Sequence, residues 1–175
     1  EFDKYIPSDE YGFYKYICSR YAAYDPQILN LRLFGVFGKY EDYTTRFISN
    51  NICRTFFNLP ISINQNVYFD YLYVDDLVKI INYFITYSPK QRLLNVGYGK
   101  KVDLLTIAQM IKKITNSPYD IQIKIPGYGK EYSCDTRLLK KEFYFTPTHL
   151  YDSIEELYAW YANNKHSISM NDFID

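Results

Sequence analysis

Residues 11–15 read Tyr11-Gly12-Phe13-Tyr14-Lys15, so that a tyrosine and a lysine stand four residues apart. On a helix this spacing brings both side chains to the same face, one turn apart. A lysine ammonium in that position favours a tyrosinate electrostatically, which makes a proton-transfer group that works near neutral pH. The chain has 21 tyrosines, so the spacing is also expected by chance, on an ordinary surface helix or around a buried structural tyrosine. The segments downstream must decide between these interpretations.

Composition narrows the class of protein. The chain has 175 residues, of which 47% are hydrophobic and 23% charged, as is ordinary for one soluble globular domain or for one domain and part of another. The formal net charge is zero and no lysine- or arginine-rich run occurs, which argues against a nucleic-acid partner. No apolar run approaches the roughly 20 residues that a membrane span needs.

The cysteines indicate the compartment. Cys18, Cys53 and Cys134 are odd in number and far apart, so they predict neither a disulfide framework nor a metal site. The two histidines, His149 and His166, add no metal-ligand spacing. We therefore expect free, buried thiols, a cytoplasmic location and no bound metal.

Apolar periodicity predicts alternating strands and helices, which is the order of an α/β fold. Helices are predicted at 10–24, 45–58, 77–87, 103–115, 135–142 and 153–163. Strands are predicted at 27–34, 61–63, 67–74, 92–97 and 121–125, and a frayed tail at 166–175. The strand at 27–34 is apolar on both faces, as in a covered parallel sheet, whereas 121–125 alternates and should bury one face. The helix at 10–24 should pack through Tyr14, Ile17, Cys18, Tyr21 and Ala22.

Several local signals accompany these elements. Asp75-Asp76 precedes a helix, so we interpret both carboxylates as helix caps rather than as a catalytic pair. The run Ser153-Ile154-Glu155-Glu156 matches a capping box, and Gln65-Asn66 predicts a turn. The segment Gly97-Tyr98-Gly99 is only part of a glycine-rich phosphate loop, because Val102 stands where the motif needs glycine.

Three motifs in order carry a family resemblance. They are 11–15, then Leu31-Arg32-Leu33-Phe34-Gly35-Val36-Phe37-Gly38, then Phe69-Asp70-Tyr71-Leu72-Tyr73-Val74-Asp75-Asp76-Leu77-Val78. Together they resemble the second half of the extended short-chain dehydrogenase/reductases, the NAD-dependent sugar-nucleotide epimerase/dehydratase family. The strand at 94–97, the helix opening near Asp103 and the run Asp135-Thr136-Arg137 before a helix with Trp160-Tyr161 fit the same pattern. The similarity extends from about residue 5 to residue 162.

The resemblance implies roles for particular residues. Tyr11 resembles the family's catalytic tyrosine, which passes a proton to or from a sugar hydroxyl. Lys15 resembles the partner lysine, which holds the nicotinamide ribose hydroxyls. The loop at 34–38 resembles the one that lines nicotinamide and sugar, so Phe34, Gly35 and Val36 are the implied cofactor contacts.

The implied substrate site has two departures from the family pattern. The implied contacts to the nucleotide sugar are Gly35, Arg46, Arg54, Asp70 and Tyr71. The family commonly has asparagine where this chain has Gly35, and arginine on the substrate diphosphate where this chain has Phe69. Either Arg46 or Arg54 supplies the missing charge, or the substrate is held differently.

The resemblance also implies a missing part. None of the seven glycines belongs to a dinucleotide-binding loop, which the family carries more than a hundred residues before the tyrosine. We therefore expect the carboxyl-terminal part of a Rossmann-like parallel sheet in 1–44. A small mixed α/β substrate-binding subdomain follows in 45–165, interleaved with returning Rossmann elements at about 67–97, and then a flexible tail in 166–175. The chain begins at Glu1-Phe2 without methionine, so we expect a cloning remnant or a piece of a longer protein.

The implied parent enzyme binds NAD or NADP and epimerises, dehydrates or reduces a nucleotide sugar. The chain alone, without the dinucleotide loop, is expected neither to bind the cofactor tightly nor to turn over. The alternative is a complete, non-catalytic binding or scaffold module derived from the same fold. Self-association is expected because the strand at 27–34 would lack its usual neighbours. The resemblance also implies a dimer through the helix at 10–24, since dimers in that family often form through the corresponding helix.

Overall fold

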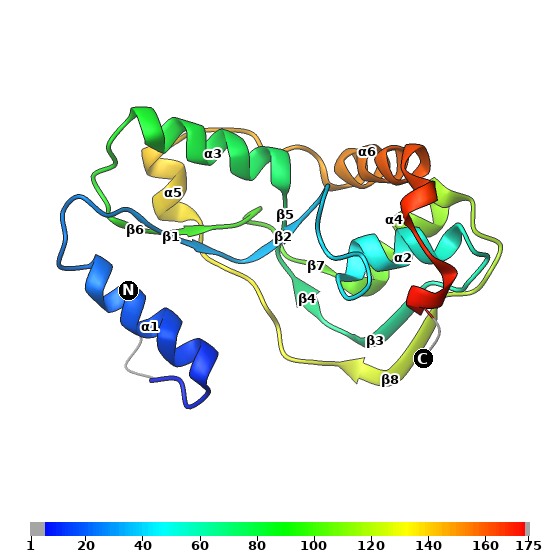
Figure 1. Cartoon of the computed structure of the whole chain (residues 1–175). Helices are drawn as coiled ribbons and strands as arrows, with labels where there is room; N and C mark the ends of the chain where they lie inside the picture. Colours follow the sequence, from blue (N-terminus) through cyan, green and yellow to red (C-terminus); the bar gives the residue numbers. More distant parts are fainter. Residues whose placement is uncertain (1–5, 174–175) are drawn as a thin grey trace.

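The chain has an α/β architecture in two lobes (Figure 1), and the computed structural model describes residues 6–173. The predicted Glu1-Phe2 remnant and the last two residues of the predicted tail lie outside the described residues. The helices are α1 (Glu10–Ala22), α2 (Phe47–Thr55), α3 (Val74–Thr86), α4 (Leu104–Thr115), α5 (Arg137–Glu142), α6 (Leu150–Asn163) and the short 3-10 helices η1 (Lys165–Ser167) and η2 (Met170–Phe173). The strands are β1 (Asn30–Leu33), β2 (Gly35–Phe37), β3 (Ser62–Asn66), β4 (Tyr68–Phe69), β5 (Tyr71–Tyr73), β6 (Leu93–Val96), β7 (Val102–Asp103) and β8 (Gln122–Tyr128).

The strands form two-stranded pairs, most of them parallel. The pairs β1–β6, β2–β5 and β3–β8 are parallel, whereas β4–β7 is antiparallel. Leu31 lies opposite Leu94, and Gly35 lies opposite Tyr71. The predicted α/β class with parallel strands is therefore confirmed.

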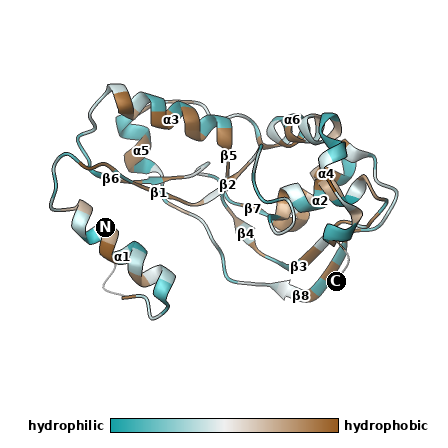
Figure 2. Cartoon of the chain, in the orientation of Figure 1, coloured by the Kyte–Doolittle hydropathy of each residue, from teal (hydrophilic) through white to brown (hydrophobic). Residues whose placement is uncertain are grey.

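Each lobe has its own hydrophobic core. In one lobe α3 and α5 cover the strands with a core of Leu72, Leu77, Ile80, Leu94, Val96 and Leu139. In the other, α2, α4 and α6 pack around the end of β3, and the largest buried side chains include Ile48, Ile52, Ile63, Ile107, Ile111 and Ile154. Figure 2 shows hydrophobic and hydrophilic residues side by side on α3 and α6, as helices with one buried face require. The chain passes between the lobes several times.

Helix α4 matches its prediction because its ends carry local signals. The Asp103 carboxylate caps the first turn by accepting from the Thr106 amide at 3.1 Å, and Asn116 ends the helix in the left-handed conformation with φ 52°. The predicted turn at Gln65-Asn66 is wrong, since both residues belong to β3. The Asn66 side chain instead supports α4, because its oxygen accepts from the Leu105 amide at 3.0 Å.

Two predicted strands are shorter or divided. The strand predicted at 27–34 begins only at Asn30, because Asp25 forms a turn whose side chain accepts from the Gln27 amide at 2.8 Å. The run predicted at 67–74 divides into β4 and β5 on either side of Asp70. The exposed strand β8 buries neither face, so the prediction of one buried face is wrong.

Two predicted helix starts are also wrong. Helix α6 begins at Leu150, so Ser153 lies inside it and donates to the His149 carbonyl at 3.1 Å instead of opening a capping box. Helix α3 begins at Val74, which puts Asp75 and Asp76 inside its first turn. Its N-cap residue is Tyr73, without a side-chain capping bond. Neither aspartate therefore caps the helix in the predicted way.

Helix α1 lies on the side of β1 opposite α3, apart from both cores (Figure 1). Within Glu10–Ala22 only Ala22 is buried, and Tyr14, Ile17 and Tyr21 are exposed. The predicted packed face is therefore confirmed only at Ala22 and is wrong for the other residues, because the described chain supplies no surface that covers them. The cysteines are free thiols, as predicted, but only Cys53 is buried, while Cys18 is exposed.

The end of the described chain is ordered against the second core. Ile168 is buried, and the Phe173 ring lies 5.8 Å from the Phe57 ring and 6.1 Å from the Tyr43 ring. The frayed-tail prediction is therefore wrong for residues 166–173. Within residues 6–173, no helix is both long and apolar enough to cross a membrane.

Candidate functional site

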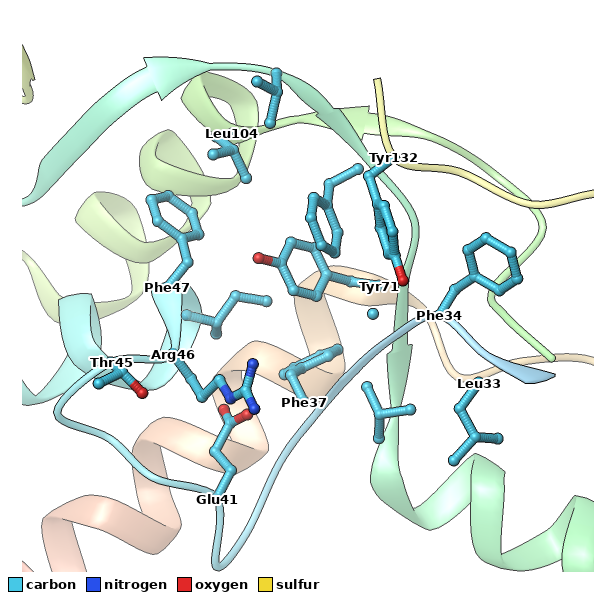
Figure 3. A pocket seen from close by; sticks show the side chains of 15 residues that line it. Leu33, Phe34, Phe37, Glu41, Thr45, Arg46, Phe47, Tyr71, Leu104 and Tyr132 are labelled. Carbon is cyan, nitrogen blue, oxygen red and sulfur yellow. The ribbon is translucent and has the colours of Figure 1, made fainter. Parts of the chain in front are cut away.

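Two adjoining cavities lie around the carboxyl end of β1. The first, of about 680 Å³, is bounded by β2, the start of α2 and the region of β4 and β5 (Figure 3). The second, of about 1150 Å³, lies between α1 and β1. Leu33, Phe34 and Tyr132 line both. In open α/β sheets ligands bind at the carboxyl ends of the strands, so this location is consistent with a functional site.

Tyr11 and Lys15 line the second cavity from the first turns of α1. The helix starts where predicted, because the Asp9 side chain accepts from the Gly12 amide at 2.7 Å. The Lys15 ammonium lies 5.4 Å from the centre of the Tyr11 ring, which confirms that the two share one face. The Tyr11 side chain is 73% exposed, so it is not a buried structural tyrosine.

Phe34, Gly35 and Val36 all line the first cavity. The prediction of a loop at 34–38 is wrong for Gly35, Val36 and Phe37, which form strand β2. Phe34 separates β1 from β2, and its amide donates to the Val96 carbonyl at 3.1 Å, which fixes this segment to β6. The segment therefore stands between the cavity with Tyr11 and the cavity with Arg46. It joins the predicted catalytic pair to the predicted substrate region.

Arg46 and Glu41 form the charged part of the first cavity (Figure 3). Among the described residues that line it, Arg46 is the sole cation and precedes α2 directly. Glu41 accepts a short hydrogen bond from the buried Ser49 hydroxyl. Burial raises the pKa of Glu41, whereas this hydrogen bond and the nearby Arg46 charge lower it. The cavity thus offers a guanidinium for an anion and an acidic group beside it.

Comparison with known proteins assigns the family. Residues 3–97, which are more than half of the chain, match the NAD dependent epimerase/dehydratase family. The chain belongs to this family. The predicted resemblance to sugar-nucleotide epimerases and dehydratases is therefore confirmed.

Individual relatives agree with this assignment. The chain is 26% identical over 159 residues to ADP-L-glycero-D-manno-heptose-6-epimerase of Brachyspira hyodysenteriae, covering 81% of this chain and 50% of that protein. Its fold is similar to UDP-glucose 4-epimerase of Thermotoga maritima, with a TM-score of 0.78, 20% identity and coverage of 89% and 54%. A dTDP-glucose 4,6-dehydratase of Bacillus anthracis gives a TM-score of 0.77, 18% identity and coverage of 92% and 54%. The chain thus spans about half the length of these relatives.

Two predicted substrate contacts of this epimerase/dehydratase chain, Arg54 and Asp70, do not line either of the two cavities. Arg54, toward the other end of α2, donates from Nε to the Pro60 carbonyl at 3.0 Å and lines neither cavity of the described chain. Asp70 is buried, and its carboxylate accepts from the Tyr98 amide at 2.6 Å and the Gly99 amide at 2.9 Å. Burial raises the pKa of Asp70, and the two amides oppose that rise. The partial glycine loop therefore binds a carboxylate of its own chain, and Asp70 has a structural role.

Tyr71 does line the first cavity, and its hydroxyl points into it (Figure 3). Burial raises the pKa of Tyr71, and the nearby Glu41 adds to the rise. Sequence reasoning missed Glu41 and Tyr132. Tyr132 reaches the site through a bridge to Phe69, 63 positions earlier, and no local pattern announces such a pairing.

Proposed function

We propose that this chain is the substrate-binding part of an NAD- or NADP-dependent enzyme that acts on a nucleotide sugar. The observation that carries the proposal is that Tyr11 and Lys15 share one cavity with Phe34, which also lines the cavity containing Arg46. A proton-transfer pair thus adjoins a site with a cation suited to phosphate. Epimerisation, dehydration and reduction all agree with this arrangement.

In the proposed chemistry Tyr11 exchanges a proton with a sugar hydroxyl, and the Lys15 ammonium holds the ribose hydroxyls of the cofactor. The second cavity fits a nicotinamide ribose, because the donors Lys15 and Tyr11 line it together with apolar residues of β1 such as Leu31 and Leu33. When bound, the nicotinamide takes up or returns the hydride. The protein's own part is to orient the sugar and to move the proton at the Tyr11 hydroxyl.

Ligands of the relatives support a nucleotide sugar without selecting the nucleotide. The Thermotoga maritima epimerase was solved with UDP-glucose, and the Bacillus anthracis dehydratase was solved with NAD. A GDP-L-fucose synthetase from Naegleria fowleri was solved with NADP. Because the seven glycines of this chain include no dinucleotide-binding loop, we propose that the chain alone neither binds the cofactor tightly nor turns over.

The compartment follows from the cysteines. Cys18, Cys53 and Cys134 are free thiols in the structure. Thiols persist in reducing compartments, whereas disulfides are typical of oxidising ones. We therefore propose that the protein acts in the cytoplasm.

Arg46 is expected to supply the positive charge that binds the substrate phosphates. The sequence alone offered Arg46 and Arg54 equally for this role. Arg46→Leu should lower the affinity of the chain for nucleoside diphosphates about tenfold or more, because a hydrogen bond to a charged group contributes about 1.5–3 kcal/mol. Titration calorimetry with UDP, dTDP, ADP and GDP measures this loss. Uridine, which carries no phosphate, should bind both forms alike.

Arg54→Leu is the matched control for that experiment. It removes the same charge from the last turn of α2, whereas Arg46 directly precedes the first turn, and the Arg54 side chain is engaged with the Pro60 carbonyl. We expect its diphosphate affinity to stay within about twofold of the wild type, provided that its melting curve remains cooperative. A loss confined to Arg54→Leu would contradict the assignment of Arg46. If the wild type binds none of the four nucleotides, the proposed function itself is wrong.

Helix α1 is expected to mediate self-association, as a homodimer. Phe13 and Tyr14 expose apolar surface on it and line neither cavity of the described chain, and exposed apolar surface marks interaction sites. Light scattering at micromolar concentration should give about twice the mass of one chain. The double variant Phe13→Glu/Tyr14→Glu should give a monomer, whereas Tyr144→Glu, which changes a tyrosine that is 88% exposed elsewhere, should leave the dimer intact. A wild-type monomer contradicts the prediction.

A further inference from the structure

Gly35 and the Phe69 ring compete for the same space in the wall of the first cavity. A Cβ atom at position 35 would lie 2.3 Å from Cε1 of Phe69 and 2.4 Å from the Asp70 carbonyl oxygen. Both distances are far below van der Waals contact. Position 35 therefore admits only glycine, because the Phe69 ring and the Asp70 backbone both occupy the space of a Cβ atom, and no side chain reaches the cavity from there.

The Phe69 ring is held rigidly by its neighbours. It stacks on Tyr71 with ring centres 4.4 Å apart, and its centre lies 4.9 Å from that of Tyr132. Tyr132 is fixed in turn, because its amide donates to the Tyr68 carbonyl at 2.9 Å and its carbonyl accepts from the Asp70 amide at 3.0 Å. The three rings form one wall, and we call Phe69, Tyr71 and Tyr132 the aromatic wall.

Charge and apolar surface are separated within the cavity. Figure 3 shows Arg46 and Glu41 on one side of Tyr71, and Tyr132 with Phe34 on the other. The side with Tyr132 and Phe34 adjoins the second cavity. A ligand that reaches from Arg46 toward Tyr11 must therefore pass over the aromatic wall.

We propose that Gly35 and Phe69 together determine substrate specificity, because they make an apolar wall on which the apolar face of the substrate's sugar ring packs. The proposal rests on the proposed function, with Arg46 as the phosphate contact. An asparagine at position 35 or an arginine at position 69 would present a polar group here. This site instead discriminates by shape and apolar contact, as pockets lined by aromatic side chains do. The preferred substrate class is a sugar nucleotide whose sugar turns its C–H groups, rather than a charged group, toward Phe69.

The test measures how much more tightly each variant binds a glucose conjugate than the corresponding free nucleotide. UDP, dTDP, ADP and GDP are titrated into the chain, each alone and as its glucose conjugate. Phe69→Leu should weaken the binding of the preferred conjugate about tenfold while the free nucleotide changes less than about twofold, as expected from the loss of one aromatic contact. Phe69→Tyr, which keeps the ring, should retain the conjugate's affinity.

Tyr68→Leu is the matched control, because it removes a neighbouring ring that stacks on Tyr128 and lines neither of the cavities formed by the described residues. It should leave both affinities unchanged. If Phe69→Leu loses equal affinity for the free nucleotide and for the conjugate, the aromatic wall contacts the nucleotide rather than the sugar, and the proposal is wrong. An unchanged conjugate affinity, or an equal effect of Tyr68→Leu, would also overturn it. If the wild type binds nucleotides and Phe69→Leu binds the conjugate equally well, only the role of the aromatic wall is wrong. If the wild type binds no nucleotide, both the proposed function and the role of the wall are wrong.

Discussion

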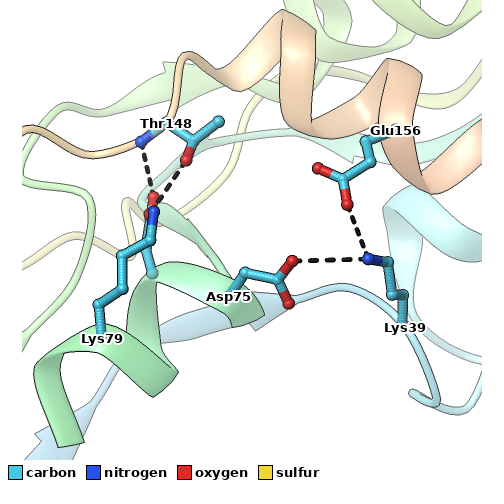
Figure 4. A network of polar contacts seen from close by, with 6 residues as sticks. Lys39, Asp75, Lys79, Thr148 and Glu156 are labelled. Carbon is cyan, nitrogen blue, oxygen red and sulfur yellow. Dashed lines mark hydrogen bonds and ion pairs between the residues drawn. The ribbon is translucent and has the colours of Figure 1, made fainter. Parts of the chain in front are cut away.

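Asp76→Ala is expected to lower the free energy of unfolding by about 3 kcal/mol, because hydrogen bonds to a buried charge contribute about 1.5–3 kcal/mol each. The Asp76 carboxylate is buried and accepts from the Thr148 amide at 2.7 Å and the Thr148 hydroxyl at 3.0 Å. Figure 4 shows Thr148 and Lys79 pointing toward one another. Lys79 adds an ion pair at 2.7 Å. The carboxylate thus ties α3 to the segment that leads into α6. Denaturant titration followed by circular dichroism measures the loss.

Asp75→Ala is a closely matched control, since it removes the neighbouring carboxylate from the same first helical turn. The Asp75 side chain is 46% exposed and pairs with Lys39 at 3.5 Å, while Lys39 keeps a closer partner in Glu156 at 2.7 Å. Exposed pairs of this kind contribute less than about 1 kcal/mol. Both variants weaken the helix dipole interaction alike, so their difference isolates the tertiary contact. Equal losses would show that Asp76 acts only within its own helix.

The two aspartates also show where local sequence reasoning ends. Both precede an apolar run, and the pattern predicts two helix caps. The distinction between them comes from Thr148, which lies 72 positions away from Asp76 and leaves no mark in the local pattern. Burial of one carboxylate and exposure of the other are therefore tertiary properties.

Features that were predicted well have their causes close together in sequence. The start of α4 at Asp103 and its end at Asn116 are encoded by capping chemistry within a few residues. The shared face of Tyr11 and Lys15 follows from helical spacing alone. The parallel strand pairs follow from strands that alternate with helices.

Features that were mispredicted depend on distant partners. The spacing of Tyr14 and Ile17 predicts an apolar helix face, but not whether this chain supplies a surface to cover it. Arg46 and Arg54 were equivalent in sequence, and the Pro60 carbonyl distinguishes them by engaging Arg54. The aromatic wall joins β4 to a loop about sixty positions later, through pairing that no periodicity indicates.

Tyr11→Phe is expected to reduce kcat of the proposed NAD- or NADP-dependent reaction by about 10³, since general acid–base catalysis contributes about 10²–10⁴. The substitution removes the hydroxyl and keeps the ring beneath the Lys15 ammonium, 5.4 Å from its centre. The cofactor and the nucleotide sugar should therefore still bind with dissociation constants within about threefold of the wild type. Steady-state turnover and equilibrium titrations, measured on the same preparation, separate the two effects.

Tyr14→Phe provides the control for Tyr11→Phe because it makes the same chemical change on the same helix. The Tyr14 side chain is 66% exposed and lines neither cavity of the described chain, so turnover should stay at the wild-type level. If turnover falls in both variants, the helix rather than the hydroxyl is responsible. If Tyr11→Phe retains full turnover, Tyr11 has no part in proton transfer. A loss of kcat in Tyr11→Phe alone, with both ligands still bound, is the result that assigns the proton transfer to the Tyr11 hydroxyl.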